Sequence, residues 1–475
     1  MKPPRLTWIT VAILSLLCLG SLFRILAYGD LRLSIATPDT PSYVRSSRNP
    51  LLSWKVFAGE RLLTTNLLYK FTVSDSECER VPRSMPGIGQ ESKRVLQRCF
   101  AGTVFFQNIL AILSWCALAY TFSQWIINPF LKLAVIVTIL TFGFTPEIAE
   151  WESILSPESL TISLFILTYA ILLAIGHQIA YASDKLTSRR ISLLIAPWMA
   201  FYLGWIFIRD AHLYTIPITG LLVILISFFP DQKKTKLIAG IVLIFFAVFA
   251  IGYRSARDSL RATYYPVTNS FNFYIAPYPS RLAYFYDRGM PELNSPDLQA
   301  WMDTHLAGIY GTFLMSHPGF VMSTLLEHKD YFSSDYLQPY FKTKGVPYYD
   351  SLFLVGEFIH PRTLTIFLIS VILIAGFLLA ALIRRDRQAI VLAWMAAWFL
   401  LATAVTLFIT FFGDVAGTRR HIFPSVEMLR LFVWLASFLF IDHFVRRQPE
   451  RITETQQVLD KQNGKSRSAD LEKKF

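Results

Sequence analysis

Charged side chains that could do chemistry stand in short segments between long apolar runs of this chain. Asp39 is the first of them, and it lies between Pro38 and Pro41 shortly after the first apolar run. Because proline fixes its backbone φ angle, a carboxylate between two prolines has limited freedom to turn away from its surroundings. Asp39 therefore has two interpretations. It is either a general base held in a fixed position or the cap of a helix that begins at Pro41.

Glutamates concentrate in a second segment, which follows the third apolar run and ends where the next one begins. Its members are Glu147, Glu150, Glu152 and Glu158. Like charges this close repel one another, so the segment is a concentrated negative site. Glu158 also falls in the first turn of a long apolar helix, where a carboxylate is stabilised by the helix dipole without having any further function.

A very short connection between two other apolar runs carries Arg209 and Asp210. Burial of such groups near lipid is costly unless they are paired. The sequence leaves two interpretations open, a local ion pair between the two side chains or a role in holding a polar substrate.

Arg419, Arg420 and His421 form a basic cluster just before the last apolar run. The guanidinium fork of arginine matches the oxygens of a phosphate, so a phosphate group is a natural partner for this cluster. The alternative is that these side chains pair with Asp414 or with the glutamate segment.

About ten apolar runs separate these segments, and each is long enough for a helix that crosses or nearly crosses a bilayer. Backbone amides in lipid must be paired within the chain, so runs of this kind form helices. The composition agrees, with 53% hydrophobic and 16% charged residues. We therefore predict an all-α polytopic membrane protein with helical loops outside the cytoplasm. The runs are 7–28, 100–122, 131–144, 159–181, 191–208, 213–229, 237–253, 363–383, 389–412 and 426–445.

Lys and Arg in the short loops set the orientation, because cytoplasmic loops carry an excess of both. They place both termini in the cytoplasm and the long loops 29–99 and 254–361 on the other side. Residues 1–446 then form one membrane domain, and the polar segment 447–475 is expected to be a disordered cytoplasmic tail. Basic loops beside anionic lipid account for much of the net charge of +12, so no nucleic-acid partner is needed.

Two of the four cysteines, Cys78 and Cys99, fall in the first long outer loop. An oxidising compartment would allow a disulfide between them. Sequence spacing alone does not give the geometry that a disulfide requires, so the free and bonded states both stay open.

The combination resembles the GT-C superfamily of polytopic glycosyltransferases, which use sugars linked to a polyprenyl phosphate at the outer face of a bacterial membrane. The resemblance is carried by the carboxylate in the first outer loop, the acidic residues in the second and the basic cluster before a late span. The residues are Asp39, Glu152, Glu158, Arg419, Arg420 and His421, with further similar stretches at 205–214, 281–291, 300–305 and 316–319. The paired acidic residues that several branches carry in the first loop are absent here.

The resemblance implies a role for each matching residue. Asp39 would be the catalytic carboxylate, and the cluster 419–421 would bind the carrier phosphate, with Arg209 as an additional candidate. Glu152, Glu158 and Asp210 would contact sugar hydroxyls or hold a divalent cation such as Mg²⁺ or Mn²⁺.

These observations together favour a membrane-embedded glycosyltransferase of the cell envelope that acts on the non-cytoplasmic face. Its partners would be membrane lipids, a polyprenyl-phosphate sugar donor and a lipid, glycan or protein acceptor. One alternative is an enzyme like an O-antigen polymerase or ligase, which uses pyrophosphate-linked donors. Another is a transporter or lipid flippase, although transporters place ionisable residues near the middle of the bilayer, whereas charge here lies at the outer ends of the runs.

Overall fold

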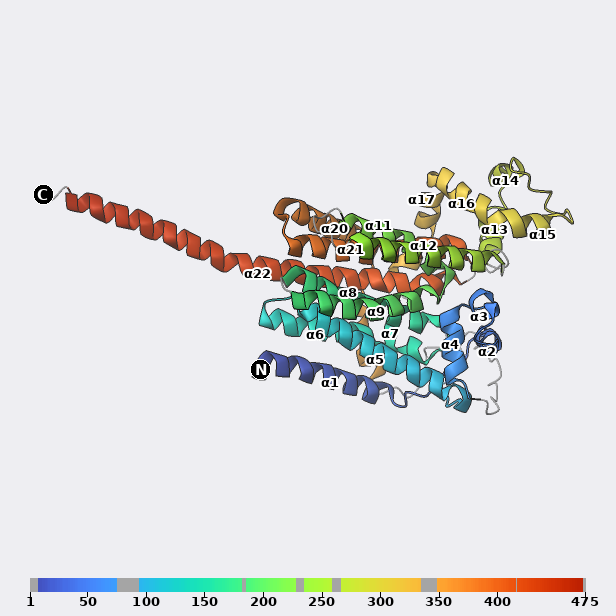
Figure 1. Ribbon diagram of the computed structural model, residues 1–475, viewed down its shortest axis with the longest axis horizontal. Coiled ribbons are helices and arrows are strands. Elements are labelled where there is room, and N and C mark those ends of the chain that lie inside the picture. Colours follow the sequence, from blue (N-terminus) through green and yellow to red (C-terminus); the bar gives the residue numbers. More distant parts are fainter. Residues whose placement is uncertain are drawn as a thin grey trace.

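The computed structural model describes residues 7–74, 94–181, 185–227, 235–258, 266–334, 348–415 and 417–472. Helices make up most of these residues, and their extended pairings are two isolated bridges, Ser34 with Val95 and Ile35 with Ile154. The prediction of an all-α fold is confirmed. Figure 1 shows the long helices lying side by side as one bundle.

Six helices in the described part of the chain are long and apolar enough to cross a membrane. A seventh span results if α6 and the short helices after it are taken together, since they are bent by 48° at one break. The six contain α1 (Trp8–Tyr28), α5 (Ala101–Ser123), α8 (Pro157–Tyr181), α20 (Thr365–Arg384), α21 (Arg387–Gly413) and the first part of α22 (Thr418–Glu472).

The predicted count of ten spans is not confirmed, although a helix covers most of each predicted run. The difference lies in α9 (Lys185–Ile206), α11 (Thr215–Ser227) and α12 (Thr235–Asp258). Their apolar parts, Leu193–Ile206, Asp210–Ile224 and Gly240–Ala256, each have 10–17 residues. The whole helices α9 and α12 have 22 and 24 residues, which at about 1.5 Å per residue is enough for the hydrocarbon thickness, so their length does not exclude them as spans.

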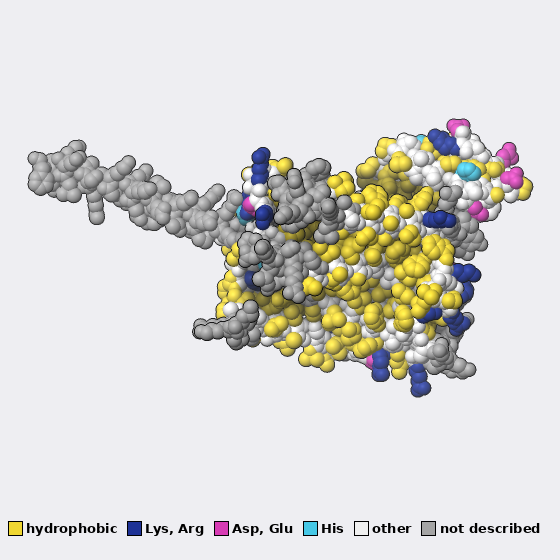
Figure 2. All heavy atoms as spheres, in the orientation of Figure 1, with side chains coloured by type: hydrophobic (Ala, Val, Ile, Leu, Met, Phe, Trp, Pro, Cys, Tyr) yellow, Lys and Arg dark blue, Asp and Glu magenta, His cyan; other side chains and the backbone are white. Residues whose placement is uncertain are grey.

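Burial differs strongly between the long helices. In the apolar stretch of α8, 83% of the residues are buried, whereas the corresponding shares in α1 and α20 are 11% and 17%. A helix that is apolar on all sides belongs either in a core or in lipid. We infer that α8 is the centre of the bundle and that α1 and α20 face lipid. Figure 2 shows the apolar surface that spreads over the bundle, with charged side chains toward its ends.

The two long loops contain short helices at one end of the bundle (Figure 1). The first loop contributes α2 (Thr40–Ser47), α3 (Trp54–Ala58) and α4 (Leu63–Thr72). The second forms a cap with its own apolar core around Phe285 and Phe313. Its helices are α13 (Thr268–Tyr274), α14 (Pro279–Tyr286), α15 (Leu298–Trp301), α16 (Ala307–Ser316) and α17 (Pro318–Glu327). The same loop also contains α18 (Asp330–Ser333), whose Phe332 packs with Phe411 of α21, and α19 (Tyr349–Ile359), which packs against α6 and α7 (Pro146–Ala149).

The disorder predicted for the tail 447–475 and the predicted disulfide both stay predictions. The helix α22 is assigned through Glu472, and the Glu, Gln, Lys and Arg residues of the tail are good helix formers. Cys78 lies outside the described residues, so its pairing with Cys99 stays a prediction.

A buried polar network fixes how α22 is rotated in the bundle. Glu427 accepts hydrogen bonds from Arg430 at 2.6 Å and from His360 Nδ1 at 2.6 Å, and none of the three side chains is exposed. The other ring nitrogen of His360 lies 2.8 Å from the hydroxyl of Thr145, at the end of α6 (Pro129–Phe144). Seven residues make about two helical turns, so Arg420 lies on the same face of α22 as Glu427.

At Gly143, α6 packs closely against α5, and a substitution at this position tests that contact. A methyl group at this position would lie 2.2 Å from the indole ring of Trp115 in α5, and that ring is fully buried. We expect Gly143→Ala to lower the free energy of unfolding by about 1–3 kcal/mol, the usual cost of overpacking a core.

The matched control is Gly220→Ala in α11, where the added methyl group meets no atom within 4 Å. This change should leave thermal unfolding in detergent unchanged or raise its midpoint, because alanine favours helix. Equal midpoints for the two variants would contradict the close contact between α5 and α6.

Candidate active site

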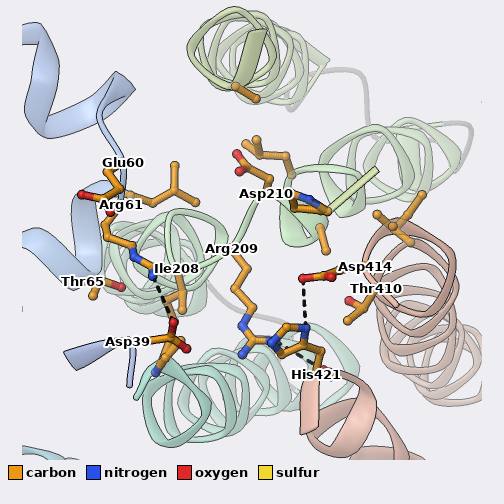
Figure 3. Close-up of a pocket in the computed structure, with 18 of the residues that line it drawn as sticks. Asp39, Glu60, Arg61, Thr65, Ile208, Arg209, Asp210, Thr410, Asp414 and His421 are labelled. Carbon is orange, nitrogen blue, oxygen red and sulfur yellow. Dashed lines mark hydrogen bonds and ion pairs between the residues drawn. The ribbon is translucent and has the colours of Figure 1, made fainter. Parts of the chain in front are cut away.

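A cavity of about 1050 Å³ opens at the end of the bundle that carries the short loop helices. Its wall combines residues of the loop between α1 and α5, the turn between α9 and α10 (Asp210–Leu213), α12 and the facing ends of α21 and α22. Figure 3 shows side chains from all these segments converging on one space. Four segments that are far apart in the sequence therefore share one site.

Asp39 lies on this wall with 34% of its side chain exposed. It occupies the N-cap position of α2 but makes no cap hydrogen bond with its side chain. Its Oδ2 instead accepts a hydrogen bond from Arg420 at 2.9 Å, and its Oδ1 lies 3.5 Å from Arg61. Of the two interpretations of Asp39, the structure supports a carboxylate directed into the cavity.

Hydrogen bonds on both sides of Asp39 attach its loop to the glutamate segment. The hydroxyl of Thr40 donates to the carbonyl of Leu155 at 3.1 Å, and the amide of Leu155 donates to Ile35 at 2.9 Å. Leu155 is only three residues from Glu158. These bonds therefore hold Asp39 at a fixed place relative to the start of α8.

Glu158 is completely buried in the first turn of α8 and does not line the cavity. Its Oε1 accepts a hydrogen bond from Arg209 at 2.5 Å and lies 3.3 Å from Nε of Arg420. A buried carboxylate is stable only when it is paired and hydrogen-bonded, and two guanidinium groups meet this need. Glu158 therefore acts by holding two arginines at the cavity wall.

Arg420 and His421 line the same cavity as Asp39, where the sequence analysis expected a phosphate-binding cluster. Nη2 of Arg420 donates to Nε2 of His421 at 2.9 Å, because a guanidinium nitrogen has no acceptor capacity. The proton of a neutral His421 ring is then on Nδ1, which lies 3.5 Å from the carboxylate of Asp414. Both ring nitrogens are thus directed at protein partners, so Arg420 rather than His421 is the group suited to bind an anion.

Arg419 is directed away from this site. It donates a hydrogen bond to the hydroxyl of Ser334 and lies over the ring of Tyr331, and it does not line the cavity. Successive helical residues point about 100° apart, so a cluster of three cannot share one face. Of the predicted basic cluster, Arg420 and His421 therefore line the cavity, whereas Arg419 contacts the end of α18.

Asp210 lines the same cavity as Asp39, as does Arg209. The ion pair of Arg209 is formed with Glu158 and not with its neighbour Asp210. Asp210 therefore lies at the wall beside Arg209, and Asp414 lies on the far side of the cavity (Figure 3).

Glu152 lies elsewhere. It is buried and accepts a hydrogen bond at 2.7 Å from Arg24 of α1, which also donates to Asn108 of α5 at 3.0 Å. This ion pair joins α1, α5 and the glutamate segment, and neither partner lines the cavity. The structure therefore gives Glu152 a supporting position, away from the place where a substrate would bind.

Arg61 is the main residue of the site that the sequence argument missed. It lines the cavity from the loop before α4, and its Nε donates to the hydroxyl of Ser42 at 2.9 Å. Its guanidinium carbon lies 4.5 Å from the centre of the Tyr43 ring. The available signal was the one that drew attention to Arg420, an arginine in a segment that the sequence predicts to lie outside the cytoplasm, where positive charge is unusual.

The wall opposite these charges is largely apolar. Phe249 and Tyr253 of α12, Leu213 of α10 and Ile409 of α21 contribute to it. The rings of Phe249 and Tyr253 are stacked with centroids 6.3 Å apart, and Tyr253 is 55% exposed. One side of the cavity therefore suits an anion and the other suits a hydrocarbon chain or a sugar face.

The described residues contain no group of three or more His, Cys, Asp or Glu side chains that could hold a metal ion. Of the three carboxylates predicted as cation ligands, Glu158 is bound by Arg209 and Glu152 by Arg24, so a divalent cation would have to displace a guanidinium group from either. A bound divalent cation stays a prediction, and the chemistry below uses none.

No family model matches this chain, and no curated protein matches it with significance. Among solved structures, it is similar to the oligosaccharyltransferase AglB of the archaeon Archaeoglobus fulgidus in complex with an inhibitory peptide and a dolichol-phosphate. The TM-score is 0.45 at 12% identity, over 95% of this chain and 52% of the other. A second structure of an Archaeoglobus fulgidus oligosaccharyltransferase, tethered to an acceptor peptide, gives 0.41 at 13%, over 89% and 49%.

This chain thus spans about half the length of the solved chains it matches. Likeness at this level bears on neither activity nor substrate.

Proposed function

We propose that the chain is a membrane glycosyltransferase that moves a sugar from a polyprenyl-phosphate donor to a lipid, glycan or protein acceptor on the non-cytoplasmic side. One observation supports this most directly. Asp39 and Arg420 are in contact on the polar side of a cavity of about 1050 Å³ whose opposite wall is apolar. A base, an anion ligand and room for a lipid are therefore present together.

Asp39 accepts the proton of the acceptor hydroxyl in this mechanism, and the oxygen attacks the anomeric carbon of the donor sugar. The bond between that carbon and the phosphate oxygen breaks, and its electron pair leaves with the carrier phosphate. A phosphate is a good leaving group, so the reaction does not need the second carboxylic acid of a glycosidase.

Arg420 stabilises the charge that the carrier phosphate gains. Glu158 and His421 hold its guanidinium in place before the substrate arrives, so little reorganisation is needed during the reaction. Arg209, held by the same glutamate, adds a second positive charge at the wall. Asp210 and Asp414 are placed to accept hydrogen bonds from sugar hydroxyls.

Asp39→Asn tests the base. The amide keeps the size of the side chain and an acceptor oxygen for Arg420 but cannot take the proton. We expect sugar transfer to fall about 10²–10⁴-fold, the usual contribution of general-base catalysis, with an unchanged unfolding midpoint. Asp30→Asn is the matched control, because Asp30 is bound to Arg32 at 2.8 Å outside the cavity. Transfer retained in Asp39→Asn would remove Asp39 from the mechanism.

Arg420→Ala tests the anion ligand, with Arg419→Ala as its control one residue away. Loss of a charged hydrogen bond should weaken binding of the donor by about 1.5–3 kcal/mol in the first variant. The second should bind the donor normally, because Arg419 is directed at Ser334. Arg420→Lys should recover only part of the loss, since the bidentate fork is absent. Equal donor affinities for Arg420→Ala and Arg419→Ala would exclude carrier binding at Arg420 and favour the transporter.

The orientation of the cavity is tested separately. A reporter that is active only outside the cytoplasm, fused after Glu292 in the cap, should be active in cells. The same reporter fused after Asp386, between α20 and α21, should be inactive, because basic inner loops require that topology. The reversed result would place the cavity on the cytoplasmic side and exclude a donor that is presented outside.

A further inference from the structure

Two arginines hold Asp39 from different segments. Arg420 donates to Oδ2 at 2.9 Å, and Arg61 approaches Oδ1 at 3.5 Å. Figure 3 shows Arg61 reaching toward Asp39 from the first outer loop. The carboxylate therefore has a guanidinium group near each of its oxygens.

The two arginines differ in what else holds them. Arg420 is fixed by Glu158, which is fully buried, and by His421. Arg61 has neutral neighbours besides Asp39, namely the hydroxyl of Ser42 and the ring of Tyr43. Burial raises the pKa of Tyr43, so this side chain stays neutral. The charge of Arg61 is thus balanced by Asp39 through its longer contact.

Positive charge exceeds negative charge at this point of the wall. The two carboxylates Asp39 and Glu158 are in contact with three guanidinium groups, those of Arg61, Arg209 and Arg420. The carboxylate nearest to Arg61 in the sequence, Glu60, is bound by Arg45 at 2.6 Å. An anion that reaches this point of the wall would therefore meet a local excess of positive charge, whereas Asp210 and Asp414 carry negative charge elsewhere on the wall.

From this geometry we infer that Asp39 occupies the position of the carrier phosphate between Arg61 and Arg420, and that the bound phosphate displaces it. Arg61 is then a second phosphate ligand, and Asp39 turns toward the acceptor. This inference rests on the proposed function and adds one residue and one step to it. A carboxylate that loses its cationic neighbours becomes a stronger base. Binding of the donor would thus activate the base.

The exchange predicts opposite effects for two variants on the binding of a lipid phosphate. Asp39→Asn removes the competing negative charge, so binding should tighten at least about threefold. Arg61→Gln removes a ligand and should weaken binding about tenfold. A residue with a merely structural role would not tighten binding when it is changed.

The experiment measures binding of decaprenyl phosphate to the purified full-length chain in detergent, with decaprenol as the uncharged probe of tail binding. Asp30→Asn and Arg32→Gln are the matched controls, since this exposed ion pair lies outside the cavity. We expect tighter binding in Asp39→Asn, weaker binding in Arg61→Gln, and the affinity of the unchanged chain in both controls. Affinity for decaprenol should be the same in all of them.

Other outcomes separate the inference from the proposed function. Equal affinity for decaprenyl phosphate in Asp39→Asn and the unchanged chain would overturn the exchange, and so would unchanged affinity in Arg61→Gln. Neither result would contradict Asp39 as the base. Phosphatidic acid that shows the same pattern at the same affinity would overturn the assignment to a carrier phosphate. If the unchanged chain binds decaprenyl phosphate no better than decaprenol, the proposed function itself fails.

Discussion

The arrangement of the residues around the cavity depends on one fully buried carboxylate. Glu158 has no exposed surface, so its charge must be compensated within the protein, and Arg209 and Arg420 provide this compensation. Removing one partner of such a group typically costs about 3–5 kcal/mol, because the other charge is left buried and unpaired. This requirement joins the start of α8, the turn before α10 and the start of α22. The same contacts direct Arg420 at Asp39.

A second set of contacts brings the first outer loop to this centre. Hydrogen bonds between Thr40, Ile35 and Leu155 fasten the loop to the glutamate segment, and the buried pair of Arg24 and Glu152 holds that segment against α1 and α5. Buried ion pairs seldom add stability over apolar residues, but they can specify one arrangement. We infer that Glu152 helps to fix the position of Asp39, whereas Glu158 fixes the position of Arg420, which contacts Asp39.

The sequence was sufficient for the helical class and for much of the polar side of the cavity. Long apolar runs require helices, and charges at the ends of those helices require partners, so Asp39, Asp210 and Arg420 could be singled out. Arg419 could not be separated from Arg420, because the rotation of α22 is set by the buried contact of Glu427 with His360, 67 positions apart. Arg61 was missed for a similar reason, since only the folded loop brings it to Asp39.

The most direct test of the account is a structure of the full-length chain with decaprenyl phosphate bound. The account predicts the phosphate within hydrogen-bonding distance of both Arg61 and Arg420, the prenyl chain along Phe249 and Tyr253, and Asp39 turned away from both arginines. A phosphate bound at another place, with the contact between Asp39 and Arg420 intact, would contradict it.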